Sequence, residues 1–248
     1  MNDLQDKVVL VTGAARRVGA AIVRRLHGEG ANVLLHHRGA EKDAATLETE
    51  LNAVRKGSVR RVKADLVAHS APEVLVRTAS ERFGRLDLLV NNASSFFPTA
   101  LGEIEEKGWE ELMGANVKAP LLLSQVAAPE LRKTKGSIVN IVDIHADRPL
   151  KGYIVYTIAK AGLAALTRSL AMELAPDVRV KGVSPGAIAW PEDGQLSPAI
   201  REHIIDDTLL KRLGEYDDIA RAVQFLACDA PYVTGEIIAV DGGRSINI

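Results

Sequence analysis

The sequence has little of several features that mark particular classes of protein. It contains one cysteine, Cys228, which excludes a disulfide within the chain and a zinc site made of several cysteines. Its 31 lysines and arginines nearly balance 32 aspartates and glutamates, so no overall field attracts nucleic acid or an anionic membrane. We therefore expect no metal site and no partner of either kind.

Long apolar runs are also lacking. No stretch approaches the roughly 20 residues that span a bilayer. The first residues, MNDLQDK, carry two acids where a secretory signal would have a basic segment. These features predict a cytoplasmic protein. Cys228 ends a helical, apolar stretch, so we expect its thiol to be buried.

What the sequence does contain is an alternation of short β-branched segments with longer stretches of helical periodicity. The expected strands cover residues 8–11, 33–35, 86–90, 137–142, 178–183 and 237–240, and the basic run 55–63 is interpreted as a helix end and an edge strand. The alternation predicts an α/β fold with a doubly wound parallel sheet (a Rossmann fold) and helices on both faces. At 248 residues and 47% hydrophobic content, we expect one domain covering residues 1–248.

The loop after the first expected strand has the character of a dinucleotide site. Residues 12–19 read TGAARRVG and lead into an amphipathic helix. Gly13 and Gly19 would let the backbone turn sharply and approach a pyrophosphate, which the free amides of the helix start would then face. A tight turn without a ligand is the simpler interpretation, but the position between a buried strand and a helix favours the cofactor.

The end of the second strand indicates which dinucleotide is used. A site selective for NAD places an acid there to hold the ribose hydroxyls, whereas this chain has His36, His37 and Arg38. Arg38, helped by Arg16 or Arg17 and by either histidine, would bind a 2′-phosphate through charge-assisted hydrogen bonds. NADPH is therefore the expected cofactor, the alternative being ordinary solvated charges at a strand end.

Two further strand ends complete the expected cofactor site. Asp65 would accept a hydrogen bond from the adenine amino group, and Asn92 would brace the fourth strand end; either also suits a plain turn. The residues expected to contact the cofactor are Gly13, Arg16, Arg17, Val18, Gly19, His36, His37, Arg38, Asp65, Leu66, Asn92, Ala93, Ser94, Tyr156, Lys160, Pro185, Gly186 and Ile188.

A tyrosine and a lysine four residues apart form the core of the expected catalytic site. Tyr156 and Lys160 share one face of a helix, and the ammonium would lower the pKa of the phenol toward the working range. Such a spacing is usually a surface pair. Asp143, however, ends the strand 13 residues earlier and so points toward the same crevice.

With these residues in place, the chain resembles the short-chain dehydrogenase/reductases over essentially its whole length. The resemblance implies Tyr156 as the proton-transfer residue, Lys160 as its electrostatic partner and Asn116 as the helix residue that holds a water in the proton relay. It also implies a homotetramer built around the last helices and strand. The motifs that carry it are Thr12-Gly13 with Gly19, Asn91-Asn92-Ala93, Asn116, Tyr156 with Lys160, Ser184-Pro185-Gly186 and Asp241-Gly242-Gly243.

Two departures from the general family pattern resemble the pteridine reductase branch. Arg17 stands where most members have the middle glycine, and Asp143 stands where most have the catalytic serine. The segment 91–98, NNASSFFP, is also similar to that branch. The resemblance implies that Phe96 stacks on one face of a pterin while the nicotinamide covers the other. It also places Ser94 and Arg17 against the substrate and the cofactor phosphates.

The chemistry of these side chains suits a pterin substrate, although a plain structural role is the alternative for the two phenylalanines. A planar heterocycle suits an aromatic sandwich, whereas a ketone needs a hydroxyl beside the tyrosine. Asp143 offers no such hydroxyl when it is ionised, but it can bond to Tyr156 and support proton delivery to a ring nitrogen. Phe96 and Phe97 would otherwise be a core pair at a strand end.

The segment around 187–212 is interpreted as a lid over the substrate. Trp190 would be its apolar wall, and Leu209 would line the pocket from the helix that follows. A surface loop with one packed indole is the alternative.

We expect an NADPH-dependent enzyme that reduces dihydropterins, with oxidised pterins or dihydrofolate as further substrates, to the tetrahydro level. The substrate-binding residues would be Arg17, Ser94, Phe96, Asp143, Tyr156, Trp190 and Leu209. One alternative is a ketoreductase or alcohol dehydrogenase of the same fold. Another is a non-catalytic NADP-binding sensor, for which a proton relay would have no use.

Overall fold

The computed structural model describes residues 4–190 and 197–248. They contain a seven-stranded, all-parallel sheet in the order β3-β2-β1-β4-β5-β6-β7, which confirms the expected doubly wound fold. The strands are β1 (Val8–Val11), β2 (Asn32–His37), β3 (Val59–Lys63), β4 (Leu88–Asn91), β5 (Ser137–Ile141), β6 (Arg179–Pro185) and β7 (Ile237–Val240).

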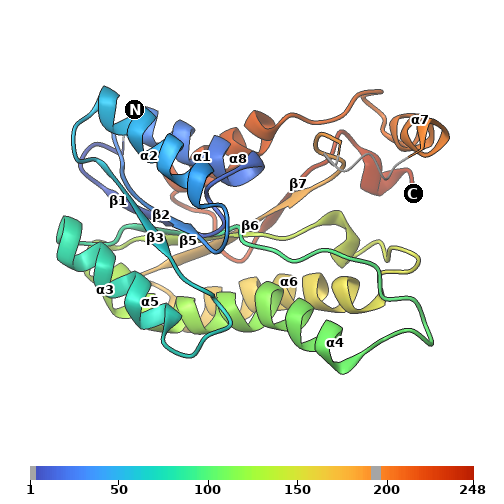
Figure 1. The fold of residues 1–248 in the computed structure, drawn as a ribbon, viewed down its shortest axis with the longest axis horizontal. Helices are drawn as coiled ribbons and strands as arrows, with labels where there is room; N and C mark the ends of the chain where they lie inside the picture. The colour runs from blue at the N-terminus through green and yellow to red at the C-terminus, as the bar shows by residue number, and fades with distance from the viewer. Residues whose placement is uncertain (1–3, 191–196) are drawn as a thin grey trace.

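Helices cover both faces of this sheet (Figure 1), as near-continuous apolar strands require. One face carries α1 (Arg17–Gly28), α2 (Glu41–Val54) and α8 (Tyr216–Cys228). The other carries α3 (Ala71–Phe83), α5 (Ala119–Thr134) and α6 (Ile154–Leu174). Two shorter helices, α4 (Glu106–Met113) and α7 (Pro198–Asp207), lie toward one end of the molecule in Figure 1.

The order of the strands indicates where a ligand would bind. The direction of winding reverses between β1 and β4, and ligands of open parallel sheets bind at such a switch point, beyond the carboxyl ends of the strands. The basic run 55–63 lies in a helix end and in the edge strand β3, as expected. The other edge strand, β7, is only partly buried, unlike the fully buried β1, β4 and β5.

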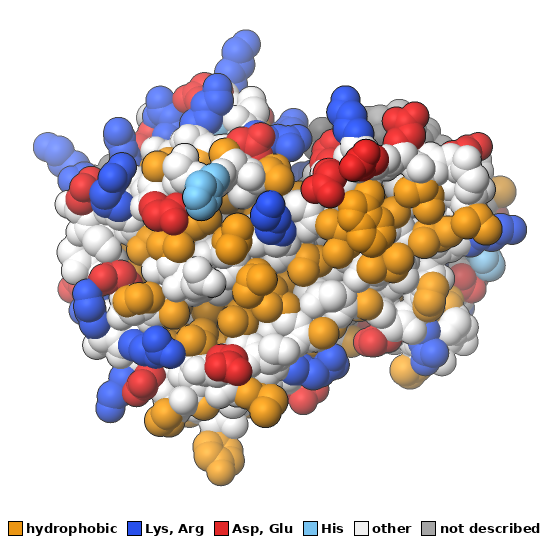
Figure 2. All heavy atoms as spheres, turned by 90° about the horizontal axis from the view of Figure 1, so that it is seen from below, with side chains coloured by type: hydrophobic (Ala, Val, Ile, Leu, Met, Phe, Trp, Pro, Cys, Tyr) orange, Lys and Arg blue, Asp and Glu red, His pale blue; other side chains and the backbone are white. Residues whose placement is uncertain are grey.

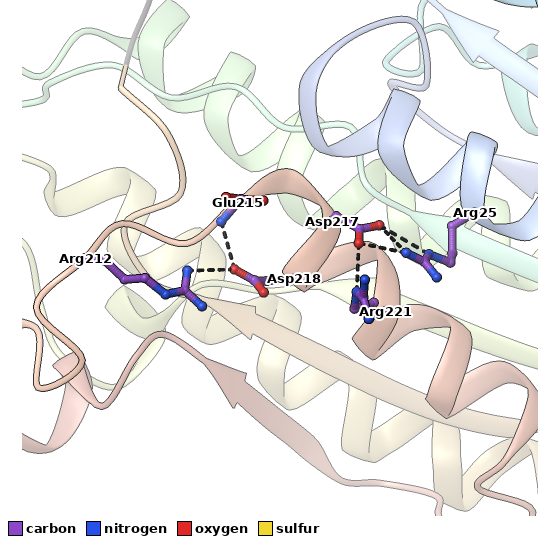
Figure 3. Close-up of polar contacts among 6 residues, drawn as sticks. All are labelled: Arg25, Arg212, Glu215, Asp217, Asp218 and Arg221. Carbon is purple, nitrogen blue, oxygen red and sulfur yellow. Dashed lines mark hydrogen bonds and ion pairs between the residues drawn. The ribbon is translucent and has the colours of Figure 1, made fainter.

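Helices α1 and α8 lie side by side on one face, although they are far apart in the sequence (Figure 1). Arg25 of α1 donates to both carboxylate oxygens of Asp217 in α8, at 2.6 and 2.7 Å from Nη2, as Figure 3 shows. Asp217 also accepts from Arg221 at 2.7 Å. The next acid, Asp218, accepts from Arg212 and from the amide of Glu215, at 3.1 and 2.8 Å. The Arg25–Asp217 pair fixes the start of α8 against α1, and the other contacts hold the acids at the start of α8 in place.

A buried amine joins the sheet to the other end of α8. Lys181 of β6 is fully buried, and its Nζ donates to the carbonyls of Leu226 and Ala230. Burial, together with the charge of Arg179, lowers the pKa of Lys181 to about 8. Cys228 lies in the same region and is buried, as expected.

Within residues 4–190 and 197–248, no helix is long and apolar enough to cross a membrane. The same residues hold no group of three or more His, Cys, Asp or Glu side chains arranged to bind a metal ion.

Candidate active site

The loop between β1 and α1 packs so closely that two positions accept only glycine. Gly13 has φ +61°, and a Cβ there would lie 2.9 Å from the Cα of Ala93. A Cβ on Gly19 would collide with the carbonyl of Gly13. The side chain of Arg16, at the N-cap of α1, makes no capping bond, so the first-turn amides of α1 stay available to a phosphate group.

Thr12, Asn92 and His36 brace this loop from three sides. Thr12 Oγ1 accepts from the amides of Asn92 and Ala93, at 2.9 and 3.0 Å. The Asn92 side chain donates to the carbonyls of Thr12 and Gly13. The expected bracing role of Asn92 is therefore present in the structure. Thr12, which the sequence shows only as part of a motif, joins the end of β1 to the end of β4 through these hydrogen bonds.

His36 has a different role from the one expected. Its Nδ1 accepts from the amide of Gly13 and its Nε2 lies 3.1 Å from the carbonyl of Ala64, so Nε2 carries the proton. Burial lowers the pKa of His36 to about 4. The neutral ring braces the glycine turn and brings no positive charge to a phosphate.

A cleft of about 610 Å³ opens beside these residues at the carboxyl ends of the strands. All the residues that the sequence predicts for the cofactor line it, and their contact with a dinucleotide stays a prediction. The cleft is lined in addition by Ala15, Gly39, Ala40, Val67, Ser95, Ala115, Ile141 and Val142. Most of these residues are direct neighbours in the sequence of a predicted site residue, and they could have been predicted on that ground.

Several cations border the cleft near β2. Arg38 is exposed and lines the cleft, and none of the described residues forms an ion pair with it. Arg16 pairs with Asp43 at 3.7 Å. His37 is buried, with Nε2 3.6 Å from Glu41, and Nδ1 makes no hydrogen bond within the described part of the chain. Arg38 is thus the cation best placed for a 2′-phosphate.

The phenol of Tyr156 and the carboxylate of Asp143 meet in the same cleft. Tyr156 Oη donates to Asp143 Oδ2 at 2.7 Å. Asp143 directly follows Val142 beyond β5 and caps the short helix η2 (Ile144–Ala146). Lys160, one turn after Tyr156 in α6, is buried; its Nζ donates to the carbonyl of Ile141 at 3.0 Å and lies 5.6 Å from the Tyr156 ring centroid.

The electrostatics of Tyr156 differ from the expectation. Burial raises the pKa of Tyr156 well above its usual range, and the charge and hydrogen bond of Asp143 raise it further. The expected lowering by Lys160 is therefore wrong for this arrangement, because an anion lies 2.7 Å from the hydroxyl and the lysine lies farther away. Tyr156 holds its proton at neutral pH. Burial lowers the pKa of Lys160 to about 8, and Asp143 opposes this.

Asn116 lies in a π-helical turn, η1 (Gly114–Lys118), a distortion that often occurs at functional sites. Its Nδ2 donates to the carbonyls of Leu112 and Ser95, at 2.9 and 3.0 Å. Its Oδ1 accepts from Ser94 at 2.7 Å. A hydrogen bond with Ser94 lowers the pKa of Tyr156, against the larger effects of burial and Asp143. A polar chain therefore runs from Asn116 through Ser94 to Tyr156 and Asp143.

An aromatic cluster stands beside this chain. Phe96 is 55% exposed; its ring stacks on Tyr153 at 4.6 Å and meets the edge of Tyr156 at 4.7 Å. Phe97, in contrast, packs into the core against Leu112 and neighbouring residues. Tyr153 is not among the residues expected from the sequence; it is the N-cap of α6, three residues before Tyr156, and this short spacing was the available signal.

The expected lid contributes less to the cleft. Its residues 191–196 lie outside those that the structure describes. Trp190 lies under the guanidinium of Arg201 at 5.3 Å, and Leu209 is half exposed. Neither these two nor Phe96 lines the cleft itself. The start of the lid is joined to the residue just after its end, since the amide of Ala189 donates to Gly214 and the amide of Gly214 donates to Ala187.

Comparison with known proteins identifies the fold family. A family model described as enoyl-(acyl carrier protein) reductase matches residues 13–245. Pteridine reductase 1 of Leishmania tarentolae is 39% identical, over 96% of this chain and 96% of that protein. The chain belongs to the short-chain dehydrogenase/reductase family.

Other members of the short-chain dehydrogenase/reductase family are nearly as similar. The 3-oxoacyl-[acyl-carrier-protein] reductases FabG of Staphylococcus epidermidis (strain RP62A) and Staphylococcus aureus (strain Mu50) are 33% and 34% identical. Both matches cover 96% of this chain, and 98% and 97% of those proteins. The protein is thus a short-chain oxidoreductase that uses NAD(P)H, and not a non-catalytic sensor.

The structure explains one departure from the short-chain dehydrogenase/reductase pattern. Arg17 replaces the usual middle glycine, and its φ is +53°, in the region that glycine occupies readily and other residues only with strain. Arg17 therefore keeps a backbone shape suited to glycine while placing a guanidinium at the cleft. Such strain tends to persist at functional sites.

Proposed function

We propose that this enzyme is an NADPH-dependent pteridine reductase. It reduces dihydropterins, and also oxidised pterins or dihydrofolate, to the tetrahydro level. The observation that carries the proposal is the bond from Tyr156 to Asp143 at 2.7 Å, in the place where most family members have a serine. A carboxylate there suits proton delivery to a ring nitrogen better than polarisation of a ketone.

The aromatic cluster supports a planar substrate. Phe96 is half exposed beside the phenol of Tyr156, so part of its ring surface would be available to a planar heterocycle. Its contact with Tyr153 holds the ring in place. The proposed pterin lies against Phe96, with Arg17 and Ser94 at its rim.

The residues of the cleft fit a phosphorylated dinucleotide. Tight glycines and the free amides of α1 suit the pyrophosphate. Arg38, with Arg16, would hold the 2′-phosphate, while His36 stays neutral and braces the loop. When bound, NADPH supplies the hydride. Lys160 and Asn92 would hold the nicotinamide half at the strand ends.

Tyr156 acts as the proton donor in this proposal. Its pKa is raised, so the phenol is protonated at neutral pH and ready to donate to a ring nitrogen. The ammonium of Lys160 stabilises the negative charge left on the oxygen. Solvent would return the proton to Tyr156 through a water held by Asn116, whose side chain is fixed by Ser94.

A ketoreductase is the competing candidate, because the FabG relatives are nearly as similar. The two functions predict opposite effects of the substitution Asp143→Ser on activity. A ketoreductase would keep or gain activity in Asp143→Ser, since the usual hydroxyl returns. A pteridine reductase would lose activity by about 100-fold or more, because general acid–base groups contribute on the order of 10²–10⁴.

The deciding assay follows NADPH oxidation with purified protein. Dihydrobiopterin, dihydrofolate, a β-ketoacyl thioester and simple ketones are compared, each with Asp143→Ser and Tyr156→Phe. Turnover of the pterins that is lost in both variants, with NADPH binding intact, supports the proposal. Turnover of ketones alone would overturn it and leave only the broader reductase function.

We also propose a homotetramer built around the last helices and strand. The edge strand β7 is only partly buried, and Phe225 of α8 and Tyr232, between α8 and β7 in the chain, are exposed. Figure 2 shows a second region, a broad band of apolar side chains on the face that carries α5 and α6. Light scattering during gel filtration should give four times the mass of the chain. A monomer at micromolar concentration would contradict this.

A further inference from the structure

The carboxylate of Asp143 uses its two oxygens for different purposes. Oδ2 accepts from the phenol of Tyr156 at 2.7 Å, and Oδ1 accepts from the amide of His145 at 2.9 Å. The position of the catalytic oxygen therefore depends on the turn η2, which follows it in the sequence. Anything that moves this turn also moves the partner of Tyr156.

The turn is held by the side chain of His145. Its Nδ1 lies 2.8 Å from the carbonyl of Arg148. A carbonyl only accepts, so Nδ1 carries the proton and donates. The bond closes the turn over residues 145–148, together with the amide of Arg148, which donates to the carbonyl of Ile144.

Arg148 then connects the turn to a distant part of the chain. Its Nε donates to the carbonyl of Ser245 at 2.8 Å. Ser245 belongs to the segment 241–247, which follows β7 and is here called the post-β7 segment. Asp241 shapes this segment by accepting from the amides of Gly243 and Ser245, at 2.9 and 2.7 Å.

The same segment also holds α7 (Pro198–Asp207). Arg244 donates to the carbonyl of Ile204 at 2.9 Å, and Asn247 donates to that of Asp207 at 2.9 Å. Both acceptors lie in α7, which runs beside the post-β7 segment in Figure 1. Gly243, with φ +81°, leaves no room for a Cβ, which would lie 2.8 Å from Leu209 Cδ1.

We propose that the post-β7 segment positions the substrate half of the active site, with Arg148 and Arg244 as its two positioning residues. Arg148 holds the turn that orients Asp143, and Arg244 holds α7 and the following Leu209. The segment makes no contribution to the lining of the cofactor cleft. Loss of either arginine therefore affects catalysis or substrate binding but leaves NADPH binding unchanged. This inference rests on the proposed roles of Asp143 and Leu209.

The test compares Arg148→Ala and Arg244→Ala with wild type, using whichever substrate the enzyme turns over. Loss of one hydrogen bond corresponds to roughly fivefold in rate or affinity. We expect kcat to fall about fivefold in Arg148→Ala and KM to rise about fivefold in Arg244→Ala. The NADPH dissociation constant should stay within about twofold in both. Arg148→Lys, which can still donate to Ser245, should recover part of kcat.

Arg77→Ala is the matched control, because Arg77 is exposed in α3 and pairs only at 3.8 Å with Glu81. It should match wild type in kcat and KM. A change in NADPH affinity equal to the change in kcat, or no change in either kinetic constant, would overturn the proposal.

Amide hydrogen exchange gives a readout that does not depend on turnover. Residues 143–148 should exchange faster in Arg148→Ala than in the Arg77→Ala control. Unchanged exchange would refute the physical link itself, whatever the substrate proves to be. Faster exchange in a protein that reduces none of the substrates would leave the link standing and overturn the pteridine reductase function.

Discussion

At the scale of single residues, the ionisation of Lys160 offers a test of the catalytic geometry. Burial lowers its pKa to about 8 and Asp143 raises it. The ammonium is present below this pKa and is lost above it, so NADPH should bind more weakly as pH rises through about 8. Asp143→Asn removes the charge that raises the pKa, so the loss of affinity should move to lower pH.

The measurement is the dissociation constant of NADPH between pH about 6 and about 10. It does not need catalysis and therefore works in a variant with low activity. Asp147→Asn, an exposed acid in the same turn, is the control and should leave the curve in place. A curve for Asp143→Asn that coincides with wild type would mean that the two charges do not interact.

Arg17 allows backbone strain to be separated from ligand binding. Its φ of +53° costs a residue with a side chain about 1 kcal/mol, which glycine avoids. Arg17→Gly should therefore raise the free energy of unfolding by up to about 1 kcal/mol while weakening NADPH and substrate binding. Urea unfolding and fluorescence titration measure the two effects.

Lys135→Gly provides the comparison for Arg17→Gly. Lys135 has φ +50° at the end of α5, away from the cleft. It should show the gain in stability without the loss of affinity. If both variants bind NADPH as wild type does, the guanidinium of Arg17 has no role in the site.

At the scale of elements, the α1–α8 pair depends on a bidentate ion pair at a part-buried position. Arg25→Ala removes three hydrogen bonds to Asp217, but both side chains are partly exposed, which screens their attraction. We expect a loss of about 1 kcal/mol in unfolding free energy.

A double-mutant cycle of Arg25→Ala with Asp217→Ala isolates the pair itself. The Arg77–Glu81 pair within α3, at 3.8 Å and largely exposed, should couple by less than about 0.5 kcal/mol. Equal coupling in the two cycles would show that the α1–α8 contact is held by apolar packing alone.

These elements also show what the sequence can predict. The strands and their common edge follow from short apolar segments between helical ones, because only helices on both faces can bury such strands. Most residues of the cleft follow in turn, since they lie at the carboxyl ends of strands or in the loops just after them, whereas Tyr156 and Lys160 come from the spacing within α6. Arg25 and Asp217, 192 positions apart, carry no such pattern. Neither does the link from Arg148 to Ser245, which depends on how two loops meet in space.

The direction of the pKa shift of Tyr156 could not be predicted from the sequence, for a different reason. The spacing to Lys160 was visible, but the balance between an ammonium and a carboxylate depends on distances and burial. In the structure burial raises the pKa of Tyr156, and the carboxylate of Asp143, which is nearer than the ammonium, raises it further.

At the scale of the whole molecule, Lys181 makes stability depend on pH. Its pKa is lowered to about 8 in the folded protein, so the unfolded chain binds more protons above that pH. Unfolding free energy should therefore rise between pH about 8 and about 10, by on the order of 1 kcal/mol from this group.

Lys181→Met tests this by urea unfolding at pH about 7.5 and about 9.5. The variant should gain less stability than wild type over that interval, whatever its stability at either pH. Lys7→Met, at the start of the same sheet and half exposed, is the control and should keep the gain. An identical rise in Lys181→Met and wild type would contradict the assignment.

The pairing of α1 with α8 has a consequence for how the protein is made. The ribosome synthesises α1 within the first 30 residues, yet the helix that packs against it, α8, begins only at residue 216. During most of translation the apolar side of α1 lacks its final neighbour, and such surfaces invite aggregation or chaperone binding. A nascent chain stalled before α8 should therefore stay sensitive to protease at its amino-terminal end and become resistant only once the last helix has emerged.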